Sequence, residues 1–87
     1  MSELTAKPKL ARLFRMQYEE AQQGYVLLYP EGMVKLNQSA SEILKRCDGE
    51  RDVQAIITDI EQSFNATNLE KDVTGFLEIA TERGWIV

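Results

Sequence analysis

The amino-acid sequence predicts an α+β domain in which a three-stranded antiparallel meander is followed by three helices, in the order β-β-β-α-α-α. Up to Leu36 the apolar residues alternate or run continuously in short segments, as β-strands require. From Ser39 onward they recur at helical spacing. At 87 residues, the chain has room for one small hydrophobic core.

Alternation, continuity and turn chemistry define the three strands. The residues expected on the buried face of the first strand, which starts near Leu13, are Phe14, Met16 and Tyr18. After a polar turn, the run 25–29 has no polar position, which is typical of a central strand covered on both faces. Pro30 and Gly32 then favour a tight hairpin into a third strand at 33–36.

Capping residues predict where the helices begin. For the first helix, Ser39–Glu42 forms a capping box, and Asn37 is a competing cap. Asp52 is expected to cap the second helix. Thr67–Glu70 forms a second capping box, which opens a third helix ending at Arg83. The residues expected in the core are Ala40, Ile43, Leu44, Cys47, Val53, Ile56, Ile57, Ile60, Phe64, Leu69, Val73, Phe76, Leu77 and Ala80. Residues 85–87 form an apolar terminus expected to dock on this core. We therefore divide the chain into a flexible tail, 1–12, and a single domain, 13–87.

Two positions of the third helix leave alternatives open. Ile79 lies on the shoulder of the apolar stripe opposite Leu77, so it either packs against the tail or Trp85, which is the ordinary account, or faces a groove that a partner fills. Gly75 costs about 1 kcal/mol relative to alanine inside a helix. Close helix packing is the favoured explanation for this glycine, and the approach of another molecule is the alternative.

The sequence offers no set of residues for catalysis, a metal or a cofactor. It has no histidine, so the commonest general base and metal ligand is missing. The single cysteine, Cys47, repeats at core spacing and is interpreted as a small buried hydrophobe. The glycines form neither a dinucleotide nor a phosphate-binding motif. These observations predict a protein that is not an enzyme.

Charge and hydropathy exclude further classes. Residues 1–15 carry a net charge of +3, whereas residues 16–87 carry −7. Because an acidic body repels phosphate, nucleic acid is not expected as a partner. The longest apolar run is far below the roughly 20 residues of a membrane helix, and residues 1–9 lack the apolar stretch of a secretory signal. The cytoplasm is the expected compartment.

The stretch Leu27–Leu44, LLYPEGMVKLNQSASEIL, resembles the signature of the pyrroloquinoline quinone (PQQ) biosynthesis protein D (PqqD) family. The likeness continues in Asp48-Gly49, in Val73 with Phe76-Leu77, and in Gly84-Trp85-Ile86. It runs from about Leu13 to the C-terminus. The resemblance implies a winged-helix-like fold and a role like that of the peptide-recognition elements of ribosomal peptide modification systems.

The resemblance also implies partners and a site. It implies a peptide chaperone without catalytic activity, which binds the precursor peptide PqqA and presents it to PqqE, a radical S-adenosylmethionine enzyme. The third strand is an outer strand, so an extended peptide can add to its open backbone groups. By analogy with related recognition elements, the peptide is expected between this strand and the third helix. The predicted peptide-binding residues are Met33, Val34, Lys35, Leu36, Asp72, Val73, Phe76, Leu77 and Ile79.

Two other functions stay open at this stage. A winged-helix regulator would bind DNA, which the acidic body and the lack of a basic recognition helix disfavour. A self-associating structural subunit would exchange strands between copies through the loop 19–24, so both a monomer and a strand-exchanged dimer are compatible with the sequence. The surface for the enzyme partner is expected elsewhere, either on the basic segment 7–15 or on the acidic face of the first two helices.

Overall fold

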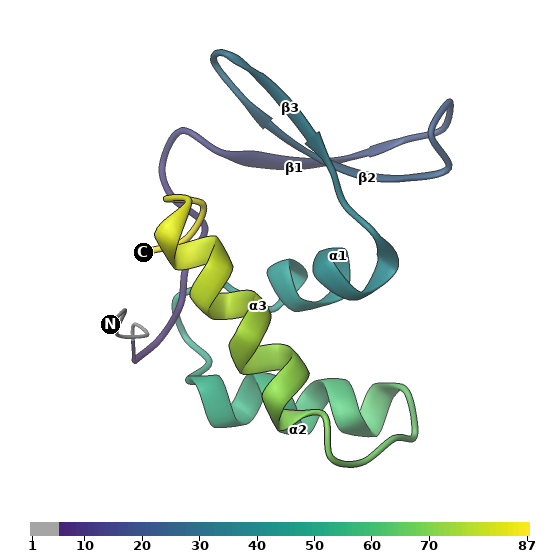
Figure 1. Ribbon diagram of the computed structural model, residues 1–87, viewed down its shortest axis with the longest axis vertical. Helices are drawn as coiled ribbons and strands as arrows, with labels where there is room; N and C mark the ends of the chain where they lie inside the picture. Colours follow the sequence, from purple (N-terminus) through teal and green to yellow (C-terminus); the bar gives the residue numbers. More distant parts are fainter. Residues whose placement is uncertain (1–5) are drawn as a thin grey trace.

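The computed structural model describes residues 6–87 and confirms the predicted class and element order (Figure 1). The elements are β1 (Arg15–Glu19), β2 (Gly24–Tyr29), β3 (Gly32–Lys35), α1 (Gln38–Lys45), α2 (Val53–Ser63) and α3 (Glu70–Glu82). The sheet lies at one end of the molecule and α2 at the other, with α1 between them (Figure 1). None of the helices in residues 6–87 has the length and apolar character that crossing a membrane requires.

Strand β2 is the centre of the sheet and pairs antiparallel with both β1 and β3. Because directly opposite residues share a face, Met16, Leu27 and Val34 point the same way. This is the face toward the helices, since Met16 packs against the buried helical core. Leu36, whose backbone pairs with Tyr25, packs against the same core.

The centre of β2 is buried on both faces, as its run without polar positions predicts, although no helix of residues 6–87 covers the face opposite α1 (Figure 1). All three helices lie on one side of the sheet (Figure 1). Val26 on the open face is nevertheless fully buried, with Gln17 and Lys35 as its cross-strand neighbours. Long polar side chains with aliphatic stems therefore take the place of a second layer.

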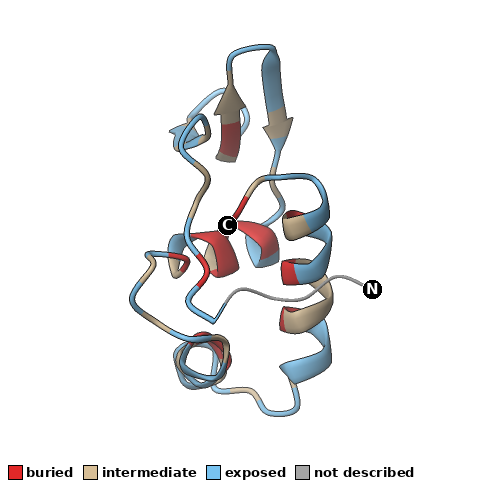
Figure 2. Ribbon diagram, turned by 90° about the vertical axis from the view of Figure 1, so that its left-hand side faces the viewer, coloured by how far each residue is buried: buried red, intermediate tan, exposed pale blue. Residues whose placement is uncertain are grey.

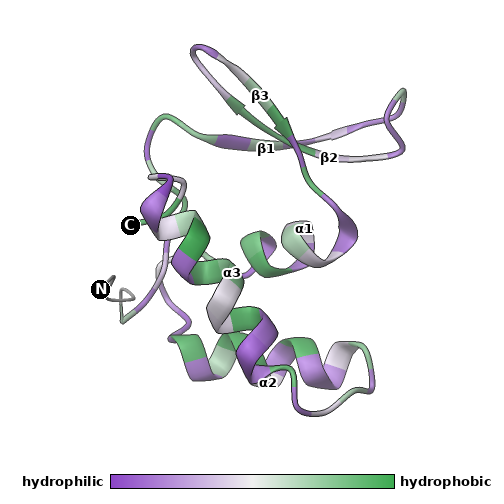
Figure 3. Ribbon diagram, in the orientation of Figure 1, coloured by the Kyte–Doolittle hydropathy of each residue, from purple (hydrophilic) through white to green (hydrophobic). Residues whose placement is uncertain are grey.

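The core lies where the helices face one another and the underside of the sheet (Figure 2). Its buried cluster consists of Ile43, Leu44, Cys47, Ile56, Ile57, Ile60, Val73, Leu77, Ala80 and Ile86. Burying one side chain the size of isoleucine contributes roughly 1.5–3 kcal/mol. Hydrophobic positions also run along β2 and β3 (Figure 3). Phe64 was predicted in the core but is 44% exposed, because α2 ends at Ser63 and Phe64 leaves the helical spiral.

Helix α1 begins at the competing cap, Asn37, and the predicted capping box at Ser39–Glu42 is wrong. The Asn37 backbone is extended, and its Oδ1 accepts the N–H of Ala40 at 2.7 Å. Asparagine is among the best N-cap residues, because its short side chain reaches an amide of the first turn. Ser39 is already inside the first turn of the helix.

The start of α2 is predicted correctly and that of α3 is not. Asp52 caps α2 by accepting the N–H of Ala55 at 2.7 Å. In α3, which begins at Glu70, no side chain of the predicted box caps the first turn. The Glu61 carboxylate of α2 instead accepts the Leu69 N–H at 3.0 Å. A tertiary contact thus replaces the local cap.

The two ends of the chain pair with each other. Lys9 and Val87 exchange two backbone hydrogen bonds of 3.1 and 2.8 Å, and the Ala11 N–H donates to the Trp85 carbonyl at 2.7 Å. Pro8 and Ile86 are buried, so the predicted docking of the apolar C-terminus is confirmed. Of the predicted tail, residues 1–5 lie outside the described residues, whereas residues 8–11 pack as part of the domain.

The two candidate caps of α1 can be separated by substitution. Asn37→Ala should lower the free energy of unfolding by about 1 kcal/mol, because a first-turn amide loses its acceptor. Ser39→Ala should change it by less than about 0.5 kcal/mol, because no cap is lost. Urea unfolding followed by circular dichroism measures both, and equal losses would contradict the assignment of Asn37 as the cap.

Candidate functional site

Strand β3 is an edge of the sheet, and its hydrogen-bond pattern fixes which of its backbone groups are open. The Leu36 N–H donates to the Tyr25 carbonyl at 3.0 Å, so these two residues form a hydrogen-bonded pair. In an antiparallel ladder, such pairs alternate with pairs that exchange no hydrogen bond. Val34 opposite Leu27 is therefore hydrogen-bonded to β2. The N–H and C=O groups of Met33 and Lys35 point away from β2 and are unpaired by the sheet.

An apolar groove lies where α1, α2 and α3 meet. Its volume is about 570 Å³, and its walls are more apolar than polar. It is lined by Gln38, Ser39, Ile43, Ile60, Phe64, Ala66, Leu69, Asp72 and Val73. The chain leaves β3 and enters the first turn of α1 after only Leu36 and Asn37. The groove is lined mostly by residues of the helices, and two of them, Gln38 and Ser39, follow the end of β3 by only a few residues.

A second hollow lies on the other side of the first turn of α1, and Gln38 lines both. It is lined by Tyr18, Gln22, Gln23, Gly24, Tyr25, Lys35, Leu36, Asn37, Gln38, Ser41 and Glu42. Polar groups make up a larger share of this lining than of the lining of the apolar groove, so it offers less apolar surface to a peptide. Because pockets for alternate side chains give strand addition its selectivity, the apolar groove is the better candidate site.

The four predicted site residues of the third strand have different surroundings. Met33 and Lys35 are exposed, whereas Val34 and Leu36 are half-buried. Val34 lies on the helix side of the sheet with Leu27, and Met33 and Lys35 lie on the open side. Leu36 follows the end of β3 and packs against the core.

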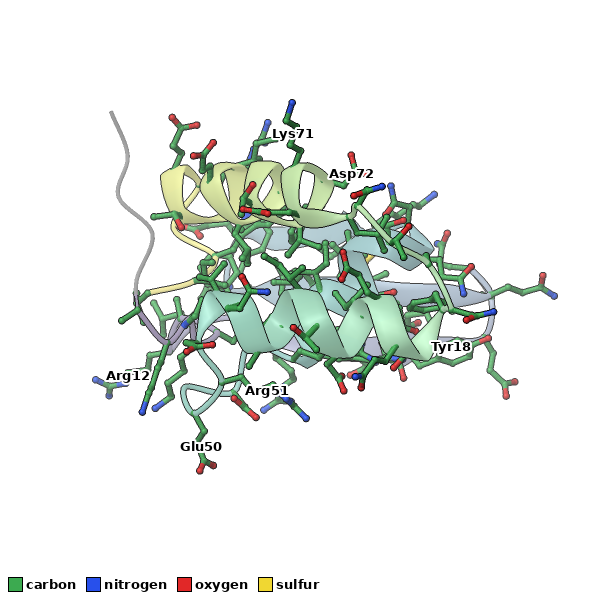
Figure 4. The ribbon with its side chains drawn as sticks, turned by 90° about the horizontal axis from the view of Figure 1, so that it is seen from below. Arg12, Tyr18, Glu50, Arg51, Lys71 and Asp72 are labelled. Carbon is green, nitrogen blue, oxygen red and sulfur yellow. The ribbon has the colours of Figure 1, made fainter. Side chains whose placement is uncertain are left out.

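The predicted site residues of α3 fall into three groups. Asp72 and Val73 line the apolar groove, and Asp72 projects from the first turn of α3 away from α2 (Figure 4). Leu77 is fully buried in the core, with no surface for a partner. Phe76 is half-buried, and its ring centre lies 6.3 Å from that of Trp85. Ile79 is 47% exposed, so the ordinary account, in which it packs away, is wrong.

Sequence reasoning missed most of the groove lining. The groove-lining residues outside the predicted set are Gln38, Ser39, Ile43, Ile60, Phe64, Ala66 and Leu69. Ile43 and Ile60 were recognised as core residues, and one side of each meets the groove. The available signal was Phe64, an aromatic residue at the last position of a predicted helix and beside a polar break, where full burial is difficult.

The groove walls α1 and α2 are tied together by Arg46. Its guanidinium donates to the Glu42 carboxylate at 3.0 Å and the Ser63 hydroxyl at 3.1 Å, and it forms an ion pair with Asp59 of α2. The hydrogen bond from Arg46 holds the pKa of Glu42 below its ordinary value, with Lys45 as a further cause. The same guanidinium donates to the Glu42 carbonyl at 2.8 Å, which fixes the end of α1.

Gly75 has no packing neighbour among residues 6–87 that explains it. A Cβ at this position would meet no heavy atom within 4 Å, so the favoured account of close helix packing is wrong. Its neighbours one turn away on the helix surface include Asp72 and Ile79, both of them exposed. This side of α3 is thus free to meet another molecule.

Cys47 is the small buried hydrophobe that its spacing predicts. It is 5% exposed, and its Sγ donates to the Ile43 carbonyl at 3.4 Å. Burial raises the pKa of its thiol to about 12, so it remains a thiol at physiological pH. A buried neutral thiol is a poor nucleophile.

An open strand edge beside an apolar groove defines a small peptide-recognition domain of the α+β class. The family model of coenzyme PQQ synthesis protein D (PqqD) matches residues 24–86, and the chain belongs to this family. The resemblance found in Leu27–Leu44 is therefore confirmed.

Curated relatives and a solved structure agree with this assignment. The PqqA binding protein of Azotobacter vinelandii is 52% identical over 99% of this chain and 97% of its own length. That of Methylococcus capsulatus is 49% identical over 90% of this chain and 84% of its own length. A solution NMR structure of the PqqD truncation of Methylobacterium extorquens PqqCD, described as a stand-alone RiPP recognition element, has a TM-score of 0.80 and 26% identity, and the match covers 98% of this chain and 95% of that one. The predicted binding role, in place of a catalytic one, is confirmed by these relatives.

The tie between Arg46 and Glu42 predicts a pH dependence of stability. The pKa of Glu42 is lower in the folded protein than its ordinary value of 4.5. The contribution of the Glu42 carboxylate to stability is therefore complete at pH values above this ordinary value, and it is lost as the pH falls through the lower folded-state pKa. The stability difference between wild type and Glu42→Gln should therefore shrink between about pH 6 and about pH 3. Urea unfolding at each pH measures it. Glu78→Gln, at an exposed position without an ion pair among residues 6–87, is the control, and a constant gap for Glu42→Gln would contradict the tie.

Proposed function

We propose that this protein binds the precursor peptide PqqA as an added strand on β3 and presents it to PqqE for modification. The observation that carries the proposal is the pair of residues, Met33 and Lys35, whose backbone groups the sheet leaves open beside an apolar groove. The guest chain extends the antiparallel ladder by one strand. Its helix-side side chains face the groove formed by α1, α2 and α3.

The two parts of the site contribute different terms to binding. Backbone hydrogen bonds to β3 are independent of sequence, whereas the groove selects apolar side chains of the guest. A micromolar complex needs about −8 kcal/mol. Burying two or three apolar side chains supplies roughly 1.5–3 kcal/mol each, and the ladder hydrogen bonds about 1 kcal/mol each. Because association also costs several kcal/mol of lost translational and rotational freedom, both the ladder and the groove anchors are needed.

The peptide contacts that we propose combine most of the residues predicted from the sequence with the residues that line the apolar groove. Met33 and Lys35 supply backbone groups, and Val34 supplies a helix-side neighbour for a guest side chain. Asp72 and Ile79 form the exposed shoulder of α3. Val73 is buried and lines the groove, and Phe76 and Leu77 support the shoulder from within.

Presentation requires a second surface for PqqE, because the guest occupies the strand edge. We place this surface on the basic segment, where Lys7, Lys9, Arg12 and Arg15 are exposed. A cytoplasmic, monomeric protein that binds no nucleic acid suits this role, as the net charge of −7 over residues 16–87 repels phosphate.

The strand-addition proposal is tested by removing an open donor. Met33→Pro removes the outward N–H without disturbing a bond to β2, so PqqA affinity should fall about tenfold or more. Met33→Ala should keep the affinity within about threefold, because the donor remains. Titration calorimetry with PqqA measures both in proteins verified as folded, and a proline variant with wild-type affinity would overturn strand addition on β3.

The groove is tested by filling it from its rim. Ser39 is exposed and lines the groove, so Ser39→Trp should obstruct it and lower PqqA affinity about tenfold without loss of stability. Ala55→Trp, at an exposed position of α2 away from the groove lining, is the matched control. Equal affinities for the two variants would show that the groove does not hold the peptide.

A further inference from the structure

The ladder of β3 specifies the guest more closely than strand addition alone. This inference rests on the proposed function, since it concerns the segment that adds to β3. A guest residue directly opposite Met33 or Lys35 would exchange hydrogen bonds with it, and one opposite Val34 would not. Since opposite residues share a face, each guest side chain is assigned to one side of the sheet.

The guest residue opposite Val34 lies on the helix side. Val34 and Leu27 occupy this face, which is turned toward the helical core, and the chain passes from it into the first turn of α1, where Gln38 and Ser39 line the apolar groove. Side chains at pairs that exchange no hydrogen bond approach most closely, with Cα atoms about 4.5 Å apart. An apolar guest side chain at this position gains burial, whereas a charged one loses its hydration.

The guest residue opposite Lys35 lies on the open side of the sheet. The inner cross-strand neighbour of Lys35 is Val26, which carries no charge. The ion pairs formed within residues 6–87 do not include Lys35. The ammonium is therefore available to an incoming carboxylate, and opposite charges across a strand pair attract.

From these two assignments we infer that β3 recognises an extended segment in which an acidic residue is followed directly by an apolar residue. The order of these two guest residues follows from the direction in which the guest strand runs. The two existing strand pairs are antiparallel, and a guest that continues the pattern meets Lys35 before Val34. Lys35 is thus a specificity-determining residue, in addition to being an edge charge that discourages unwanted strand pairing.

A charge-swap experiment with PqqA as the probe tests the acidic position. Lys35→Glu should weaken binding of wild-type PqqA about fivefold. Lysine is then placed at each acidic position of the peptide in turn, and one of these peptides should regain affinity for the Lys35→Glu protein. Arg51→Glu makes the same change in net charge in the loop before α2, outside β3, the groove lining and the proposed PqqE surface, and it should change affinity less than twofold and restore no peptide.

The outcomes separate this inference from the proposed function. If PqqA does not bind the wild-type protein, the proposed function fails. If PqqA binds but no lysine peptide is rescued by Lys35→Glu, or if Arg51→Glu has the same effect, the inference fails while the proposed function stands. Once the restored position is known, replacement of the following peptide residue by serine should weaken binding more than replacement of the preceding one. The reverse result would overturn the antiparallel order.

Discussion

The hydrogen bond from the Leu36 N–H to the Tyr25 carbonyl sets the phase of the β2–β3 ladder, and the binding properties of the edge depend on that phase. A shift by one residue would turn the amide of Val34 outward and move Lys35 to the helix side. The pairing register of β2 and β3 is fixed at both ends of the hairpin. The turn at Pro30 and Glu31 fixes one end of the hairpin, and Leu36 anchors the other by packing against the helical core. The backbone groups that are open to a guest are thus determined by core packing.

The helices complete the site because they are held at a fixed separation. The apolar groove needs α1, α2 and α3 to stay apart at their meeting point, and close packing at that point would remove it. Arg46 links α1 to α2, and the Glu61 carboxylate of α2 holds the N-terminal end of α3 through the Leu69 amide. The charged side chains that form these ties lie outside the groove lining, and those of Arg46 and its ion-pair partners keep part of their exposure to water, so the groove itself remains mainly apolar.

The elements could be predicted from the sequence because each has a local signal, such as alternation in β1, the hairpin at Pro30, and the Asp52 cap. The errors lie where a choice depends on three-dimensional context. Ser39 and Asn37 are both good caps by composition, and only the geometry of the chain leaving β3 selects Asn37. Leu77 was included in the site by analogy with related recognition elements, as a residue on one shoulder of the apolar stripe next to Phe76. The helical rotation between the two turns Leu77 into the core.

An open edge strand is also a risk of aggregation, and the features that limit this risk are those that give the site its selectivity. β3 is only four residues long, and an exposed lysine stands at its end. A short, charged edge pairs weakly with an arbitrary strand, because few backbone hydrogen bonds form and an unmatched ammonium must be partly dehydrated. A guest overcomes this barrier only if it brings extra free energy, either from side chains that enter the groove or from a carboxylate that meets Lys35. If a peptide adds to β3 as we propose, its selectivity arises because the backbone ladder alone is too short to hold a partner.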